Sequence, residues 1–77
     1  MLKLSVERQR RGWSKTKLGI RAEINPVSIG LIEMGRTPVW PAWRKRLSYA
    51  LNIPESELFD QNGHPIEEVL SDGNQTA

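Results

Sequence analysis

Residues 13–35 read WSKTKLGIRAEINPVSIGLIEMG and predict two short helices joined by a tight turn. Ser14 and Asn25 are residue types that cap helix N-termini, and Pro26 suits a first helical position. Each cap lies between two apolar residues at the spacing of a hydrophobic staple. The four staple residues are Trp13, Leu18, Ile24 and Ile29. Two such starts, separated by a turn of about three residues, predict a helix-turn-helix motif.

The rest of the chain favours helices as well. The expected helices cover residues 2–11, 15–22, 26–34, 40–51 and 54–59, and a further helical turn is expected within 65–70. Alternating apolar residues at the start also fit a strand, but the Arg and Gln that follow favour a helix. The helix over 40–51 is expected to bury one stripe of side chains. That stripe comprises Trp40, Trp43, Leu47, Ala50 and Leu51.

Two residues of this pattern carry specific expectations. Gly19 lowers helix propensity, which makes sense where another backbone approaches closely, although a merely tolerated glycine fits equally well. Asn52 can adopt the left-handed conformation that ends the preceding helix.

Size and composition limit the function classes. The chain has 77 residues, which make one small domain, and it contains no Cys and a single His, His64. We therefore expect no disulfide, no metal site and no cofactor. No apolar run approaches the ~20 residues of a membrane span. We expect a cytoplasmic protein with no membrane or small-molecule partner.

The charges are divided along the chain. Residues 3–46 carry eleven Lys and Arg and three Glu, a net charge of +8, whereas residues 47–77 carry six acids and no Lys or Arg, a net charge of −6. The division fits either an unevenly charged solvated surface or a face that binds a polyanion, and we favour the polyanion. Phosphate-neutralising candidates are Lys15, Lys17 and Arg36, with one or more of Arg8, Arg10, Arg11, Arg44 and Lys45.

A family resemblance extends over residues 2–60. The residues that carry it are Leu4, Arg8, Gly12, Ser14, Leu18, Ile24, Ile29, the run Ile32-Glu33-Met34-Gly35-Arg36, Pro38, the run Ala50-Leu51-Asn52-Ile53, Leu58 and Phe59. This pattern resembles the Cro and lambda-repressor-like helix-turn-helix domains of the XRE group. The resemblance implies an all-α, five-helix domain over residues 1–60, in which Glu33 matches a mainly structural position and is interpreted as a brace with Arg8 as its candidate partner. It also implies a bacterial or phage transcriptional regulator that binds double-stranded DNA, usually as a homodimer. The composition changes after residue 60, so residues 61–77 are expected to form an acidic, partly disordered tail, with the disorder over 71–77.

The resemblance also implies which residues contact DNA. The helix over 26–34 would enter the major groove, while the start of the preceding helix and the loop after 34 would contact phosphates. The implied DNA-binding residues are Lys15, Thr16, Lys17, Asn25, Pro26, Val27, Ser28, Leu31, Arg36 and Thr37. The segment of helix five and the tail is the implied dimer region.

Several residues depart from the family pattern. Pro26, Val27 and Leu31 are apolar where many relatives carry Gln, Arg or Asn, so they can touch thymine methyl groups but cannot make paired hydrogen bonds. Glu23 stands where a turn glycine is usual, and a positive φ there would cost on the order of 1 kcal/mol. The loop that contains Arg36 is one residue shorter than in many members.

For some side chains the sequence fits more than one role. The run from Arg8 to Arg11 fits a solvated helix face or a DNA backbone contact. The three Trp are expected to pack against the core or its edge rather than to stack on bases. Ile20 is either a lone exposed apolar residue or part of a contact surface.

A second function fits the charge pattern. An antitoxin-like or adaptor module would use the acidic tail, with Asp60, Glu67, Glu68 and Asp72, to bind a basic partner. An enzyme is not expected, because the chain has no Cys, no His–carboxylate constellation and no glycine-rich phosphate loop.

Overall fold

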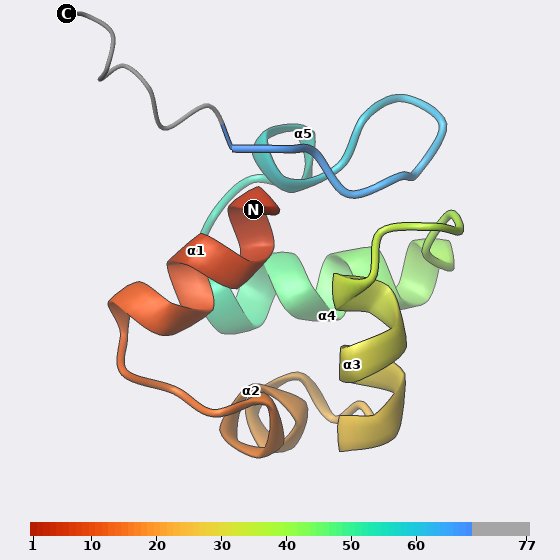
Figure 1. Ribbon diagram of the computed structural model, residues 1–77. Helices are drawn as coiled ribbons and strands as arrows, with labels where there is room; N and C mark the ends of the chain where they lie inside the picture. The colour runs from red at the N-terminus through yellow and green to blue at the C-terminus, as the bar shows by residue number, and fades with distance from the viewer. Residues whose placement is uncertain (69–77) are drawn as a thin grey trace, which may run out of the picture.

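Five helices form the described part of the chain, residues 1–68 of the computed structural model (Figure 1). They are α1 (Lys3–Arg10), α2 (Lys15–Ala22), α3 (Pro26–Glu33), α4 (Pro41–Leu51) and α5 (Glu55–Leu58). No strand is present in these residues, so the predicted all-α class is confirmed. Figure 1 shows α4 running across the middle of the fold, with α1, α2 and α3 arranged around it and α5 at one end.

The two predicted caps are present. The Ser14 hydroxyl accepts a hydrogen bond from the Lys17 N–H at 3.0 Å, and the Asn25 Oδ1 accepts one from the Val27 N–H at 2.8 Å. Each bond satisfies one of the N–H groups that a helix start leaves without an internal partner. The starts of α2 and α3 are therefore determined by residues adjacent to them in sequence.

The ends of α2 and α4 use left-handed residues. Glu23 has φ 59° and Asn52 has φ 58°, so the conformation expected for Asn52 is confirmed. The residue after each of them closes the helix: Ile24 N–H donates to the Gly19 carbonyl, and Ile53 N–H donates to the Ser48 carbonyl. This is the Schellman type of helix end, which satisfies otherwise unpaired carbonyls.

Gly19 lies where the turn folds back over α2. A Cβ atom at this position would lie 2.5 Å from the Ile24 carbonyl oxygen and 3.4 Å from the Pro26 nitrogen. Such a distance is shorter than real Cβ contacts allow, so no larger residue fits without moving the turn. The close backbone is that of the turn and of the start of α3, which explains why a glycine stands in this helix.

The core takes at least one buried side chain from every helix. The fully buried side chains are Leu4, Leu18, Ile29, Leu47, Leu51 and Leu58. The staple residues pack here too: Ile24 is buried, and Trp13 is partly buried against the core. Burial of these side chains is the main favourable term for a domain of this size.

One predicted core residue is wrong. Trp40 is 70% exposed, whereas Trp43 and Ala50 are partly buried and Leu47 is fully buried. Trp40 precedes the first turn of α4, with an extended ψ of 142°, so helical spacing does not apply to its side chain. The buried stripe of α4 therefore begins at Trp43.

After α5 the chain turns at residues 61–63, and residues 65–68 then run beside the N-terminal residues without forming a helix. Lys3 N–H donates to the Ile66 carbonyl, and Glu68 N–H donates to the Met1 carbonyl, both at 2.8 Å. Ile66 N–H donates to the Leu58 carbonyl. These long-range bonds use the backbone groups that a helix would need, so the helical turn predicted from Pro65 is wrong over Pro65–Glu68. The rest of that turn, and the predicted disorder of 71–77, lie outside the described residues.

Among the described residues, none of the helices combines the length and the apolar composition that a bilayer span requires.

Candidate nucleic-acid interface

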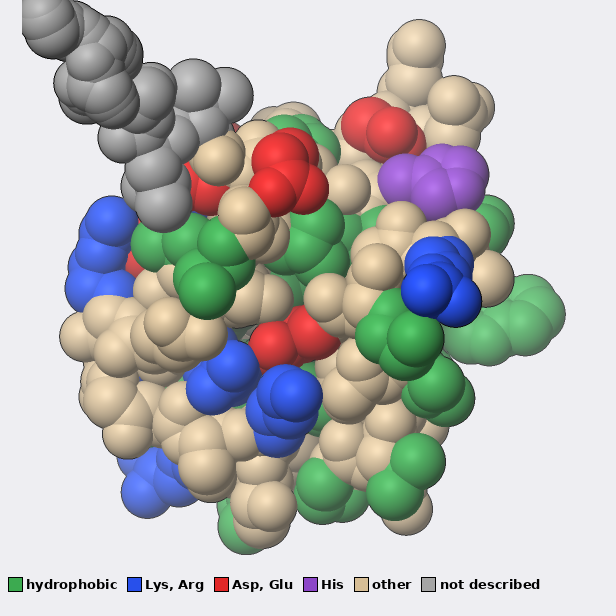
Figure 2. Space-filling model, in the orientation of Figure 1, with side chains coloured by type: hydrophobic (Ala, Val, Ile, Leu, Met, Phe, Trp, Pro, Cys, Tyr) green, Lys and Arg blue, Asp and Glu red, His purple; other side chains and the backbone are tan. Residues whose placement is uncertain are grey.

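The outer side of α3 is presented to solvent. Val27 is 73% exposed and Leu31 is 60% exposed, and Pro26 is exposed at the start of the helix. Ile29 and Ile32 on the opposite side are buried in the core. Figure 2 shows hydrophobic side chains over the position of α3, with Lys and Arg side chains beside them. The helix is thus anchored by one face and free on the other.

The predicted contact residues around α3 are all at the surface. Ser28 is half-buried, and the other nine are exposed: Lys15, Thr16, Lys17, Asn25, Pro26, Val27, Leu31, Arg36 and Thr37. The most extensive helix packing in the described chain joins α2 to α3. Because α2 is seen nearly end-on in Figure 1 while α3 runs up the page, the two axes cross steeply. The described fold therefore holds the starts of both helices in one fixed arrangement.

The cations divide into two groups. Lys15, Lys17 and Arg36 are exposed and make no ion pair within residues 1–68. In contrast, Arg8 and Arg11 bind groups inside the fold. The first three are therefore available to an external anion.

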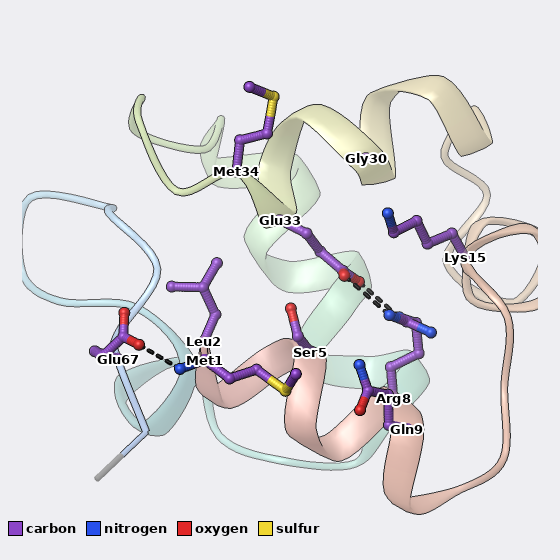
Figure 3. Close-up of a pocket in the computed structure, with 10 residues that line it drawn as sticks. All are labelled: Met1, Leu2, Ser5, Arg8, Gln9, Lys15, Gly30, Glu33, Met34 and Glu67. Carbon is purple, nitrogen blue, oxygen red and sulfur yellow. Dashed lines mark hydrogen bonds and ion pairs between the residues drawn. The ribbon is translucent and has the colours of Figure 1, made fainter.

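Arg8 and Glu33 form the brace that the sequence indicates. Arg8 Nε lies 2.7 Å from Glu33 Oε2, and Arg8 Nη2 lies 3.0 Å from Glu33 Oε1 (Figure 3). Arg8 Nη1 also donates to the Trp13 carbonyl at 2.8 Å. Only 10% and 7% of the two side chains are exposed, so this pair joins α1 to the end of α3 and neither member is a free DNA contact.

An open cleft between α1 and α3 surrounds this ion pair. Its lining residues are Met1, Leu2, Ser5, Arg8, Gln9, Lys15, Gly30, Glu33, Met34 and Glu67. Figure 3 shows Lys15 at the rim on the side of α3, while Arg8 and Glu33 point toward each other across the cleft. The floor of the cleft is therefore occupied by paired charges.

Glu7 is the centre of a second ion-pair cluster. Its carboxylate lies 2.8 Å from Arg11 Nη1, 3.1 Å from Arg10 Nη1 and 3.8 Å from Lys3 Nζ. The hydrogen bond from Arg11 lowers the pKa of Glu7, with the nearby charges of Arg10 and Lys3 adding to it, while burial opposes the shift. This cluster is not among the features expected from the sequence. The i+3 and i+4 spacing of Glu7 to Arg10 and Arg11 is the signal that could have revealed it.

Two further candidate phosphate contacts are engaged within the fold. Arg11 Nη2 donates to the Leu51 carbonyl at 2.6 Å, and Arg44 Nη1 donates to the Val39 carbonyl at 2.6 Å. Arg44 Nε also lies 3.8 Å from a Glu55 oxygen. The inclusion of Arg8, Arg11 and Arg44 among phosphate contacts is therefore not supported, because their guanidinium groups tie helices together.

Two apolar side chains near the site, Trp13 and Ile20, differ in how far they are buried. The Arg21 guanidinium lies 5.0 Å from the centroid of the Trp13 ring, a cation–π distance, so Trp13 packs at the edge of the core as expected. Ile20 is exposed.

No metal-binding cluster of three His, Asp or Glu side chains occurs among the described residues.

Comparison with known proteins returns no family model, no curated protein and no solved structure that matches the chain. What the chain does must therefore be inferred from its own residues and their geometry.

Proposed function

We propose that the chain is a lambda-repressor-like DNA-binding domain that regulates transcription. In this proposal α3 lies in the major groove, and α2 crosses the DNA backbone. The observation that carries it is the exposed face of α3, flanked by exposed Lys15, Lys17 and Arg36, which make no ion pair within residues 1–68. The homodimer implied by the resemblance stays a prediction.

The helix starts support phosphate binding. The Ser14 side chain satisfies one first-turn N–H group of α2 and leaves those of Lys15 and Thr16 without a partner in residues 1–68. The start of α3 offers fewer donors, because Pro26 has no N–H group and Asn25 binds that of Val27. A helix N-terminus also carries partial positive charge, so phosphate oxygens are favoured there. Lys15, Thr16 and Lys17 occupy the first turn of α2 and add side-chain donors at the same place.

The distribution of acids agrees with this orientation. In Figure 2 the acidic side chains gather mainly near α5 and the C-terminal segment, away from the lower part of α3. Glu33 is the one carboxylate of α3, and Arg8 neutralises it. The face proposed to meet DNA therefore carries little negative charge to repel phosphates.

The adaptor alternative gains no support from residues 61–68. Glu67 pairs with the N-terminal amino group, and Glu68 pairs with Lys3 at 3.4 Å. The Asp60 carboxylate accepts hydrogen bonds from the N–H groups of Asn62 and His64. These acids contact their own chain, so they are less available to a basic partner.

Salt titration tests the DNA proposal. Binding of a fluorescent random-sequence duplex is measured by anisotropy between roughly 50 and 200 mM KCl. If Lys15, Lys17 and Arg36 each neutralise one phosphate, log K falls with log[salt] with a slope of about −3 per chain. Each of Lys15→Gln, Lys17→Gln and Arg36→Gln should make the slope shallower by about 1.

Lys45→Gln is the matched control. Lys45 was a candidate phosphate contact from the sequence, but in the fold it is an exposed cation on α4 that lies 3.8 Å from a Glu55 oxygen and lines a different surface with Tyr49 and Arg46. It is therefore left out of the proposed face. Its replacement removes the same charge but should leave the slope unchanged. Binding that does not respond to salt, or an equal effect of Lys45→Gln, would contradict the proposed face.

A further inference from the structure

The outer face of α3 lacks the groups that read bases by paired hydrogen bonds. Pro26, Val27 and Leu31 are exposed and apolar, and Gly30 has no side chain. Ser28 has one hydroxyl and is half-buried, so it cannot form a bidentate contact. Glu33, the one ionisable residue of α3, is held by Arg8. A base contact by this face must therefore be mainly apolar.

Only one base offers an apolar group in the major groove. Thymine presents its 5-methyl group there, whereas the other bases present hydrogen-bond donors and acceptors. We propose that α3 selects duplexes by their thymine methyl groups, with Val27 and Leu31 as the residues that contact them. This inference rests on the proposed DNA binding and adds the chemical feature that is recognised.

The spacing of the two side chains fits successive contacts. Val27 and Leu31 are four residues apart on one face of α3, a rise of about 6 Å along the helix axis. Base pairs along DNA are about 3.4 Å apart. A helix aligned with the groove would thus place the two side chains roughly two base-pair steps apart.

The surroundings favour DNA over an apolar protein partner. Lys15, Lys17 and Arg36 are exposed cations without ion pairs among the described residues, and two of them lie in the first turn of α2, adjacent to α3. An apolar protein surface would leave these charges without partners, whereas phosphates flanking a groove would satisfy them. The apolar strip and the cations together match one ligand, a duplex that carries methyl groups.

The test replaces thymine with deoxyuridine, which differs only by the missing methyl group. A tightly bound duplex is first selected from a random pool, and its dissociation constant at one fixed salt concentration is compared with that of the same duplex containing deoxyuridine. Loss of one buried methyl contact should weaken binding about fourfold, and loss of two about 15-fold. The selected duplexes should also contain thymines within the contacted half-site.

Two variants connect the effect to α3. Leu31→Gln should reduce the thymine-to-uracil ratio of affinities from about 15-fold to about fourfold, since one contact is lost. Tyr49→Gln replaces a side chain on α4 that is 89% exposed, and it should leave the ratio unchanged. Circular dichroism shows whether each variant is folded, and the ratio for the unmodified chain does not depend on either variant.

The possible results of these binding experiments distinguish methyl recognition from DNA binding in general. Equal binding of the thymine and uracil duplexes, with a steep salt dependence for both, would overturn methyl recognition and leave the proposed DNA binding in place. Absence of binding to any duplex at low salt would overturn both. A thymine-to-uracil ratio that Leu31→Gln does not change would show that α3 is not the reading element.

Discussion

Glu23 combines a common side chain with an uncommon backbone conformation. Its φ of 59° lies in the left-handed region, where a Cβ atom costs about 1–2 kcal/mol. The side chain is exposed, and only its backbone carbonyl accepts a bond, from Arg46. We predict that Glu23→Gly raises the free energy of unfolding by about 0.5–1 kcal/mol, because relief of strain exceeds the added flexibility of the unfolded chain. Urea denaturation measures the change.

The control for Glu23 is Glu57→Gly. Glu57 is an exposed acid in the helical conformation of α5, so glycine should lower the stability there by up to about 1 kcal/mol. The opposite signs distinguish backbone strain from the loss of a negative charge. Stabilisation by both substitutions would contradict the prediction.

Glu7 makes stability depend on pH. Because the fold lowers its pKa below the ordinary value of 4.5, the unfolded chain takes up a proton first as the pH falls. The stabilisation is therefore complete above about pH 5 and is lost as the pH falls through the lower pKa of the folded state. We predict that Glu7→Gln is less stable than the natural chain at neutral pH, and that the difference shrinks in acid.

Urea denaturation at a series of pH values tests this prediction. Glu57→Gln is the control, since Glu57 is exposed and makes no ion pair within residues 1–68. It should follow the natural chain at every pH. A destabilisation by Glu7→Gln that stays constant down to about pH 3 would indicate packing rather than charge.

At the scale of elements, the ion pair between Arg8 and Glu33 joins α1 to α3. Removal of one partner leaves the other charge nearly buried, which costs about 3 kcal/mol. Arg8→Met and Glu33→Leu should each lower the free energy of unfolding by this amount. In the double variant the free energy of unfolding should fall by only about 1 kcal/mol, because no unpaired charge is left in the fold. The main loss is then the hydrogen bond from Arg8 to the Trp13 carbonyl.

A double-mutant cycle by urea denaturation measures this coupling. Lys45→Met is the comparison, because Lys45 is exposed and lies 3.8 Å from Glu55, and it should cost less than about 1 kcal/mol. If the losses of unfolding free energy in the two single variants add up to the loss in the double variant, the ion pair between Arg8 and Glu33 contributes little to stability. This coupling bears on the proposed function, because Glu33 is the last residue of α3, the helix whose outer face is exposed.

At the scale of the whole molecule, the N-terminus and residues 65–68 lie against each other and close the described fold. The segment that ends at Glu68 pairs with Met1 and Lys3 beside α5, and this acidic region lies away from the lower part of α3 (Figure 1). The predicted salt dependence of DNA binding belongs to this scale, because it counts the exposed cations that flank α3 and make no ion pair within residues 1–68. Lys15, Lys17 and Arg36 remain available, while Arg8 and Arg11 are engaged within the fold.

The local elements of this protein were predictable from the residues that form them. Caps at Ser14 and Asn25, the turn at Glu23, and the division of α3 into buried and exposed sides all depend on neighbours within a few positions. Such short-range bonds and periodic burial leave a signal in the order of residues. The five helices and the surface of α3 were therefore correct.

The partners of the long charged side chains depended on how the helices pack. Arg11 reaches the Leu51 carbonyl, 40 positions away, and the Lys3 ammonium group lies 3.4 Å from a carboxylate oxygen of the distant Glu68. No local pattern encodes such contacts, because they exist only after the core brings remote segments together. The path of residues 65–68 beside the N-terminus was missed for the same reason, whereas Trp40 was misplaced because helical spacing was extended by one residue beyond the start of α4. Packing therefore determines which cations stay available to an external anion, whereas sequence alone identifies the helix that they flank.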